Sequence, residues 1–215
     1  MKDIQKPQVG DNYYSTKKYN HLKRFIAYYY QFSSILDLKP KTVLEVGSGS
    51  NITAELLRKS GIEVSVSDID KQVNPDIVSD VRDIKAPDNN YDVVAAFQIL
   101  EHIPFDELDK ALSELSRVSK KYAVISVPYK STGFEFVLMI PFMRTLFKKD
   151  FLDFHIRWPL KFHGFEKSGQ HYWEIDSKDF KLKKVRKELE KHFTIKKEFS
   201  PALNKFHHFF ILEKK

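Results

Sequence analysis

The sequence contains no cysteine, and this absence excludes disulfide bonds, thiolate catalysis and metal sites with thiolate ligands. Glycine is scarce as well, with only seven in 215 residues. The N-terminus lacks the apolar stretch of a secretory signal, and no run approaches the roughly 18 apolar residues of a membrane-spanning helix. We therefore expect a cytoplasmic protein.

What is present is an ordinary globular composition with a basic C-terminal end. Hydrophobic residues make up 42% of the chain and charged residues 30%, and 215 residues suffice for one domain of ample size. The formal net charge is +7, and residues 161–215 carry 13 Lys and one Arg against eight acidic residues. Such an excess is typical of a solvated lysine-rich surface, and it also suits an anionic partner such as nucleic acid or a membrane.

The hydrophobic pattern predicts strands that alternate with helices over the first part of the chain. We expect helices at about Lys17–Leu36, Ile52–Lys59 and Phe105–Lys120, and strands at Thr42–Val46, Glu63–Ser67, Ile77–Ser79, Tyr91–Phe97 and Tyr122–Val127. This alternation indicates an open parallel sheet with helices on both faces.

The C-terminal part breaks the alternation. A lysine-rich helix at about Ser177–Lys191 leads to two strands, Phe193–Phe199 and Phe206–Leu212. The connection between these strands is too short for a parallel crossover, so they must pair antiparallel. The segment 129–172 has no clean place in the alternating scheme.

The first expected strand runs into a glycine loop, in the stretch VLEVGSGSN at residues 43–51. Ligands of such sheets bind at the carboxyl ends of the strands, where glycine lets the backbone approach them closely. Glu45 beside this loop would repel a pyrophosphate but attract a cation. S-adenosylmethionine has an α-ammonium, a sulfonium and no phosphate, so it suits this loop better than a dinucleotide does.

Two further carboxylates follow the next strands. Asp68 lies about 20 residues past the glycine loop, where an acid binds ribose hydroxyls, and Asp70 is the second candidate. Asp80 follows the third expected strand, and its carboxylate could accept from the exocyclic amino group of adenine. Asp68 and Asp80 together predict a nucleoside site.

At these residues the chain resembles the class I S-adenosylmethionine-dependent methyltransferase family, in particular its small-molecule-type methyltransferase domain. The resembling stretches are VLEVGSGSN, VSVSDID, DIVSDVRDI, YDVVAAFQILEHIP and ALSELSRVSKKYAVISVP, which cover about Thr42 to Pro128. The resemblance implies an α/β fold: a Rossmann-like, seven-stranded, mostly parallel sheet with an antiparallel C-terminal strand and helices on both faces.

The resemblance also implies a cofactor site. Its residues would be Glu45, Gly47, Ser48, Gly49, Asp68, Ile69, Asp80, Val81, Phe97 and Gln98. Glu45 and Gly47 would serve the methionine end, Asp68 the ribose, and Asp80 with Val81 the adenine. Phe97 and Gln98 would line the pocket near the methyl donor. Ser50 replaces the more common third glycine of the loop, and a small side chain still permits the turn.

His102 is the candidate catalytic residue, in the group LEHIP at residues 100–104. A neutral imidazole could take a proton from a hydroxyl or amine during methyl transfer. The alternative is that Glu101 and His102 organise the loop and start the next helix. The remaining histidines predict no metal site, because they lack the spacing of metal ligands; we considered His155, His163, His171, His207 and His208.

We expect one methyltransferase domain over residues 1–215. It divides into an N-terminal helical cap (1–38), a cofactor-binding core (39–128), a substrate-cover insertion (129–172), and a C-terminal helix with a strand pair (173–215). The insertion contains VLMIPFMRTLF, which would suit an apolar pocket cover, a core or dimer contact, or a membrane surface beside Arg144 and Lys148.

The predicted function is transfer of a methyl group from S-adenosylmethionine to a small acceptor. Apolar and aromatic molecules are candidates for this acceptor. The basic C-terminal end motivates an RNA or tRNA methyltransferase as the first rival, and a non-catalytic binding domain of the same fold is the second. A nicotinamide oxidoreductase is disfavoured by Glu45 and by the terminal strand pair. The acceptor, the methylated atom and the oligomeric state stay open.

Overall fold

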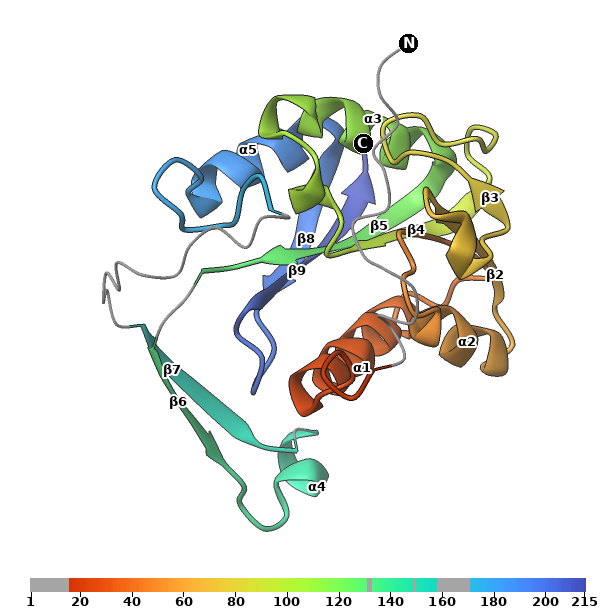
Figure 1. The fold of residues 1–215 in the computed structure, drawn as a ribbon. Coiled ribbons are helices and arrows are strands. Elements are labelled where there is room, and N and C mark those ends of the chain that lie inside the picture. The colour runs from red at the N-terminus through yellow and green to blue at the C-terminus, as the bar shows by residue number, and fades with distance from the viewer. Residues whose placement is uncertain (1–15, 131–132, 149, 158–170) are drawn as a thin grey trace.

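A single mixed sheet of seven strands organises the protein (Figure 1). The computed structural model describes residues 16–130, 133–148, 150–157 and 171–215. The sheet has the order β3-β2-β1-β4-β5-β9-β8. The strands are β1 (Thr42–Val46), β2 (Glu63–Asp68), β3 (Ile77–Val78), β4 (Tyr91–Phe97), β5 (Ser119–Pro128), β8 (Phe193–Phe199) and β9 (His207–Lys214). β9 runs in the opposite direction to the other six strands, which confirms the predicted fold class.

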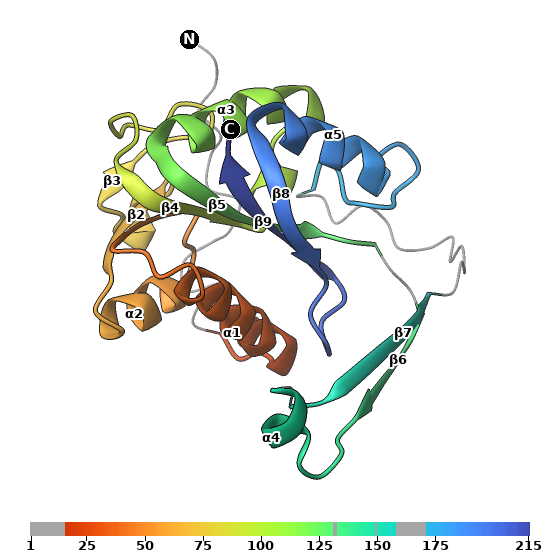
Figure 2. The same cartoon turned by 180° about the vertical axis from the view of Figure 1, so that it is seen from behind.

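Helices cover both faces of this sheet, as the alternation predicted (Figure 2). On one face lie α1 (Leu22–Leu36) and α2 (Ile52–Lys59), and on the other lie α3 (Leu108–Val118) and α5 (Leu182–His192). Side chains alternate between the faces along each strand, so Val43 packs towards α1 and α2 while Leu44 packs towards α3 and α5. The sheet therefore carries two hydrophobic cores, one on each side.

Most predicted elements lie where the sequence placed them, but several boundaries were wrong. α3 begins at Leu108, after a 3-10 turn at Phe105–Glu107, and β5 begins at Ser119 and not at Tyr122. α1 begins at Leu22 because residues 16–20 form a separate turn, closed by the bond from Asn20 N–H to Thr16 C=O. α3 ends at Val118 because Ser119 already pairs with Tyr91 in the sheet. α5 begins at Leu182 because residues 176–180 close a turn of their own.

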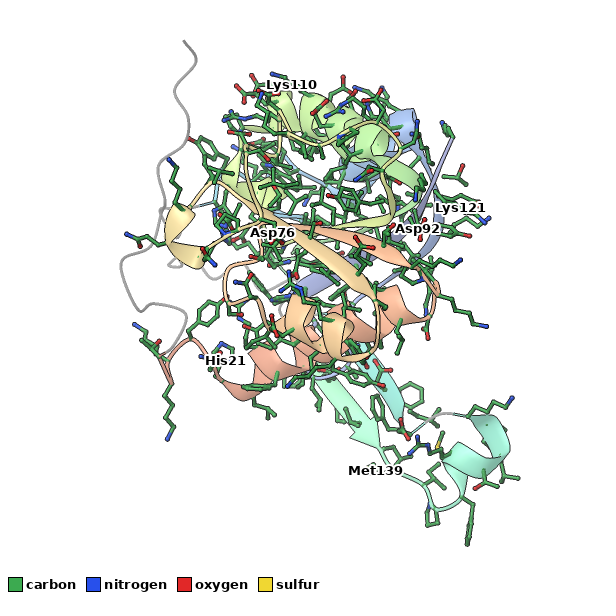
Figure 3. The ribbon with its side chains drawn as sticks, turned by 90° about the vertical axis from the view of Figure 1, so that its right-hand side faces the viewer. His21, Asp76, Asp92, Lys110, Lys121 and Met139 are labelled. Carbon is green, nitrogen blue, oxygen red and sulfur yellow. The ribbon has the colours of Figure 1, made fainter. Side chains whose placement is uncertain are left out.

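The sequence did not predict a second, two-stranded sheet, which we call the β6–β7 ribbon. It consists of β6 (Gly133–Leu138) and β7 (Leu152–Arg157), with the short helix α4 (Met143–Phe147) between them. Figure 3 shows Met139 on this part of the chain, which projects away from the seven-stranded sheet.

The two faces of the ribbon differ in polarity. One face consists of three cross-strand pairs: Phe134 with Ile156, Phe136 with Phe154, and Leu138 with Leu152. The four aromatic and aliphatic side chains Phe134, Phe136, Phe154 and Ile156 are more than half exposed. On the other face, Glu135 and Asp153 both bind Lys205, from the loop before β9. No described helix is both long and apolar enough to span a membrane.

Candidate functional site

A cleft opens at the carboxyl ends of β1, β2 and β4, where the strand order reverses and where ligands bind in such sheets. Its cavity measures about 330 Å³, within the range of small-molecule sites. The structure brings every predicted site residue to this cleft: Glu45, Gly47, Ser48, Gly49, Asp68, Ile69, Asp80, Val81, Phe97, Gln98 and His102. The sequence thus predicted which residues lie together; their individual roles stay predictions.

Gly47 begins the loop that forms the floor of the cleft. Its φ of +74° lies in the left-handed region, and its N–H donates to the carbonyl of Ser67 at 2.7 Å. A Cβ atom on Gly47 would lie 2.2 Å from Cγ2 of Ile99, a side chain from the loop after β4. Only glycine fits both the conformation and the space, and its lack of a side chain leaves the backbone open to a ligand.

Glu45 is a buried carboxylate on β1, with a side chain that points towards the cleft lining. Among the described residues, its Oε2 atom has no hydrogen-bond partner. Burial raises the pKa of Glu45 to about 8, against the opposing influence of the Ala54 N–H and the Arg58 charge. A cationic group placed beside Glu45 would satisfy this oxygen and favour its ionised form.

Asp68 ends β2 and lies next to the glycine loop, since Val46 and Ser67 are partners in the sheet. Its Oδ1 accepts from the N–H of Asp70 at 2.9 Å, and burial raises the pKa of this carboxyl. Asp70, the second candidate for ribose binding, instead caps the short helix at 71–73 by accepting from Gln72 N–H. Asp68 is therefore the acid whose side chain is available to a ligand.

Asp80 lies on the same side of the cleft but is held by an arginine that the sequence did not single out. Arg82 donates from Nε to Oδ1 at 2.8 Å and from a terminal nitrogen to Oδ2 at 2.5 Å, and it also pairs with Glu107. Burial alone would raise the pKa of Asp80, but the bonds from Arg82 hold it below its ordinary value. Asp80 is thus an ionised acceptor of fixed orientation.

Across the cleft lie Glu101, His102 and a residue far along the chain, His171. Residues 171–175 run beside the end of β5, with Ile175 N–H donating to Pro128 C=O. Tyr172 N–H donates to the carbonyl of Glu101 at 2.8 Å, and Trp173 Nε1 donates to the carbonyl of Ile103 at 3.2 Å. These bonds fix His171 against the loop after β4.

Glu101 is fully buried, and neither carboxylate oxygen has a hydrogen-bond partner within the described part of the chain. Burial raises the pKa of Glu101 to about 8. Glu101 and His102 belong to the short 3-10 helix Leu100–His102, as expected if they organise the loop. The ring of His102 also lies in the cleft, 5.0 Å from the ring of His171 between centroids. Both interpretations of His102, as a general base and as a residue that organises the loop, therefore stay predictions.

Aromatic and basic side chains from the two ends of the chain complete the cleft. Tyr28 of α1 bonds through its hydroxyl to Ser50 Oγ at 2.8 Å, so the residue in place of the third glycine anchors the helix. The guanidinium of Arg24 lies over the ring of Tyr19 at 4.4 Å. Burial lowers the pKa of His207 to about 3, so this imidazole is neutral. No single motif in the sequence marks these residues, because they come from separate elements.

Only part of the segment predicted to cover the substrate lies at the cleft. No described residue of the β6–β7 ribbon lines it, whereas His171, at the end of the same segment, does. His163 lies outside the described residues. The covering role of 129–172 stays a prediction.

Comparisons with known proteins agree with this fold. Residues 19–182 match the family model described as "Methyltransferase domain". No curated protein matches the sequence significantly. The structure is similar to a SAM-dependent methyltransferase from Aquifex aeolicus, with 16% identity, a TM-score of 0.59, and coverage of 93% of this chain and 96% of that chain.

Two further similar structures were solved with bound ligands. Magnesium protoporphyrin IX methyltransferase from Synechocystis, with bound SAH, has 14% identity, a TM-score of 0.58, and coverage of 99% and 91% of the two chains. The 1,6-didemethyltoxoflavin-N1-methyltransferase from Burkholderia thailandensis, with bound 1,6-didemethyltoxoflavin and S-adenosylhomocysteine, has 14% identity, a TM-score of 0.60, and coverage of 98% and 93%. At these identities the likeness establishes a shared fold.

Proposed function

Because the chain belongs to the methyltransferase domain family, we propose that it transfers a methyl group from S-adenosylmethionine to a small-molecule acceptor bound in the cleft. The protein is an S-adenosylmethionine-dependent methyltransferase. Beyond this class of enzyme, we propose what kind of acceptor it uses and which residues bind each part of the ligands.

The observation that carries the cofactor assignment is the buried Glu45, with an unpartnered oxygen, beside the open backbone of Gly47. An anionic phosphate would add a second negative charge next to this carboxylate, whereas the α-ammonium of the methionine moiety would neutralise it. Asp68, at the end of the adjacent strand, would accept from the ribose hydroxyls. Asp80, oriented by Arg82, would accept from the adenine amino group.

When bound, S-adenosylmethionine supplies a methyl group on a sulfonium, which passes to a nucleophile by direct displacement. The chain's contribution is to hold both partners in line and to exclude water. Phe97 at the end of β4 and Gln98, whose side chain donates to Ser126 Oγ at 3.3 Å, border the centre of the cleft. His102 would accept a proton from an acceptor that has one to lose.

The side chains opposite the cofactor residues favour a small acceptor. They are Tyr19, Arg24, His102, His171, Phe206 and His207. Aromatic rings with a few polar groups are typical of a small-molecule pocket, and an aromatic acceptor would stack on them. Two of the similar structures are named for small-molecule substrates, magnesium protoporphyrin IX and 1,6-didemethyltoxoflavin.

The RNA alternative finds less support in the described residues. No lysine among them lines the cleft, although lysine dominates the basic C-terminal end. Several cations of that end pair with acids: Lys181 with Asp176, Lys191 with Glu188, and Arg186 with Glu198. Binding of a mixed-sequence RNA oligonucleotide that weakens steeply with salt would favour this alternative.

Calorimetric titration with S-adenosylmethionine, S-adenosylhomocysteine and NADH tests the proposal. We expect the two sulfur ligands to bind with dissociation constants on the order of micromolar, and NADH not to bind. Asp68→Ala should weaken binding by roughly 1–3 kcal/mol through lost hydrogen bonds. Asp179→Ala, at an exposed position outside the cleft, is the matched control. A folded protein that binds neither sulfur ligand would refute the proposal.

A further inference from the structure

Glu101, His102 and His171 form a compact cluster on the acceptor side of the cleft. One potential ligand atom from each of the three side chains lies within 4.8 Å of the other two. Two of these residues follow β4 and the third precedes α5, so the fold brings together groups that are distant in the sequence. Two imidazoles and one carboxylate form a donor set that divalent transition metals prefer.

The carboxylate of Glu101 is the observation that points to a ligand. It is fully buried, and among the described residues neither of its oxygens has a hydrogen-bond partner. A buried carboxylate with no partner is unfavourable, because it has lost its hydrogen bonds to water without replacement. A cation held against these oxygens would remove that cost.

His171 is oriented as metal-binding histidines usually are. Its Nδ1 lies 2.7 Å from Oε1 of Glu174, which leaves Nε2 as the nitrogen for a second interaction. A carboxylate on the far nitrogen fixes the ring and its tautomer, and it makes the near nitrogen a better ligand. The backbone bond from Tyr172 to Glu101 holds the two parts of the cluster together.

The charged groups near the cluster favour a cation. Once a cation displaces the proton of Glu101, Glu101 and Glu174 supply two negative charges, one in direct reach and one through His171. Arg24, which lines the same cleft, is the opposing positive charge. This leaves a surplus of one carboxylate, which would attract a cation into the space between the three side chains.

We propose that Glu101, His102 and His171 bind one divalent transition-metal cation, with Glu174 as the positioning residue. Ligands on such a cation lie about 3.4 Å apart when metal–ligand distances are near 2.1 Å. Small side-chain rotations would therefore draw the three groups inward from their 4.8 Å limit. Three protein ligands leave at least one coordination position open towards the cleft.

The open position would take an oxygen or nitrogen of the acceptor and polarise it, and this role would replace proton abstraction by His102, whose one free lone pair the metal would occupy. This role rests on the proposed function, whereas the binding of the metal does not. Histidine spacing along the chain predicted no metal site. That argument did not consider Glu101, and it could not foresee that residues 171–175 return to the loop after β4.

The test is a titration of metal-free full-length protein with Co²⁺, followed by the visible absorption of the bound ion, then competition with Zn²⁺ and with Mg²⁺. We expect one Co²⁺ to bind, Zn²⁺ to displace it, and Mg²⁺ not to, because Mg²⁺ prefers oxygen ligands. His171→Ala and Glu101→Gln should each weaken Co²⁺ binding at least 100-fold. Glu174→Gln should weaken it about 10- to 100-fold.

Two controls make the outcome decisive. His192→Ala, at a histidine outside the cleft, should leave Co²⁺ binding unchanged. Titration of each variant with S-adenosylhomocysteine reports whether it is folded and whether the cofactor site works, independently of the metal. Should the folded wild type bind no Co²⁺, or should the variants bind it as the wild type does, the metal site is refuted while the methyltransferase assignment stands. If Glu101→Gln fails to fold, His171→Ala decides alone.

Discussion

A Cβ atom on Gly47 would lie 2.2 Å from Cγ2 of Ile99, so the turn after β1 leaves no room for a side chain against the loop after β4. The φ of Gly47, +74°, is also unfavourable for any other residue. We expect Gly47→Ala to lower the free energy of unfolding by about 2–4 kcal/mol, from backbone strain and overpacking together. It should also weaken S-adenosylhomocysteine binding at least tenfold. Urea denaturation and calorimetry measure the two effects.

Gly61 offers a matched control, because its φ is +82° but a Cβ atom there would meet nothing within 4 Å. Gly61→Ala should cost only the strain of a left-handed residue, about 1–2 kcal/mol, and leave ligand binding unchanged. Equal losses in the two variants would mean that backbone conformation alone, and not the contact with Ile99, makes Gly47 necessary.

The carboxyl of Glu45 predicts a pH dependence of stability. Its folded pKa of about 8 lies above the ordinary value of 4.5, so between these values the native state keeps a proton that the unfolded chain has lost. The contribution of Glu45 is therefore most favourable below pH 4.5 and is lost as the pH rises through about 8. We expect Glu45→Gln to reduce the downward slope of stability by up to about 1.4 kcal/mol per pH unit.

The same carboxyl should govern cofactor affinity in the opposite direction. A cationic ligand requires ionised Glu45, so the affinity for S-adenosylhomocysteine should rise between pH 6 and pH 8 in the wild type. In Glu45→Gln the affinity should be lower and nearly flat over this range. Glu63→Gln, at an exposed position at the start of β2, should behave as the wild type. A wild-type affinity that does not change with pH would contradict the assignment of Glu45 to a cation.

The sequence predicted well which residues meet on the side of the cleft that we propose for the cofactor, because that side consists of consecutive strand ends. The alternation of strands and helices placed Glu45, Asp68 and Asp80 at one edge of a parallel sheet, and the structure brings them to one cleft. Local signals were sufficient because parallel strands point their carboxyl ends the same way. The antiparallel C-terminal pair was equally predictable, since a short connection permits nothing else.

The side of the cleft that we propose for the acceptor was not predictable by these means. His171 reaches the cleft through backbone bonds from Tyr172 and Ile175, and hydrophobic periodicity does not encode such pairings. The β6–β7 ribbon was missed for another reason. Its apolar and polar residues alternate as in a half-buried strand, but it packs into neither hydrophobic core and has no place in the alternation of strands and helices. Arg82 was missed because a charged pair two residues apart resembles an ordinary surface contact.

Lys205, in the loop before β9, forms ion pairs with both strands of the β6–β7 ribbon. Its Nζ lies 2.5 Å from Asp153 and 3.3 Å from Glu135, and its side chain is only 12% exposed. We expect Lys205→Met to accelerate hydrogen exchange in β6 and β7 while the midpoint of urea denaturation changes little, because the ribbon contributes to neither core. Lys181→Met, which removes an exposed pair with Asp176, should leave exchange in the ribbon unchanged. Slower exchange in the Lys205 variant would show that the pairs strain the ribbon.

The hydrogen bonds from Arg82 to Asp80 lead to a prediction about how the adenine base is recognised. Arg82 fixes both oxygens of Asp80 and keeps its pKa low, so the carboxylate is an ionised acceptor in the cleft, where we propose that it binds the adenine amino group. The wild type should therefore bind S-adenosylhomocysteine about tenfold more tightly than S-inosylhomocysteine, which has no amino group to donate. In Arg82→Met, the Asp80 side chain is released, and this preference should fall to near unity. Arg58→Met, which removes an arginine outside the cleft, should keep the full preference. If the Arg82 variant keeps it too, the preference for adenine does not depend on the hydrogen bonds from Arg82 to Asp80.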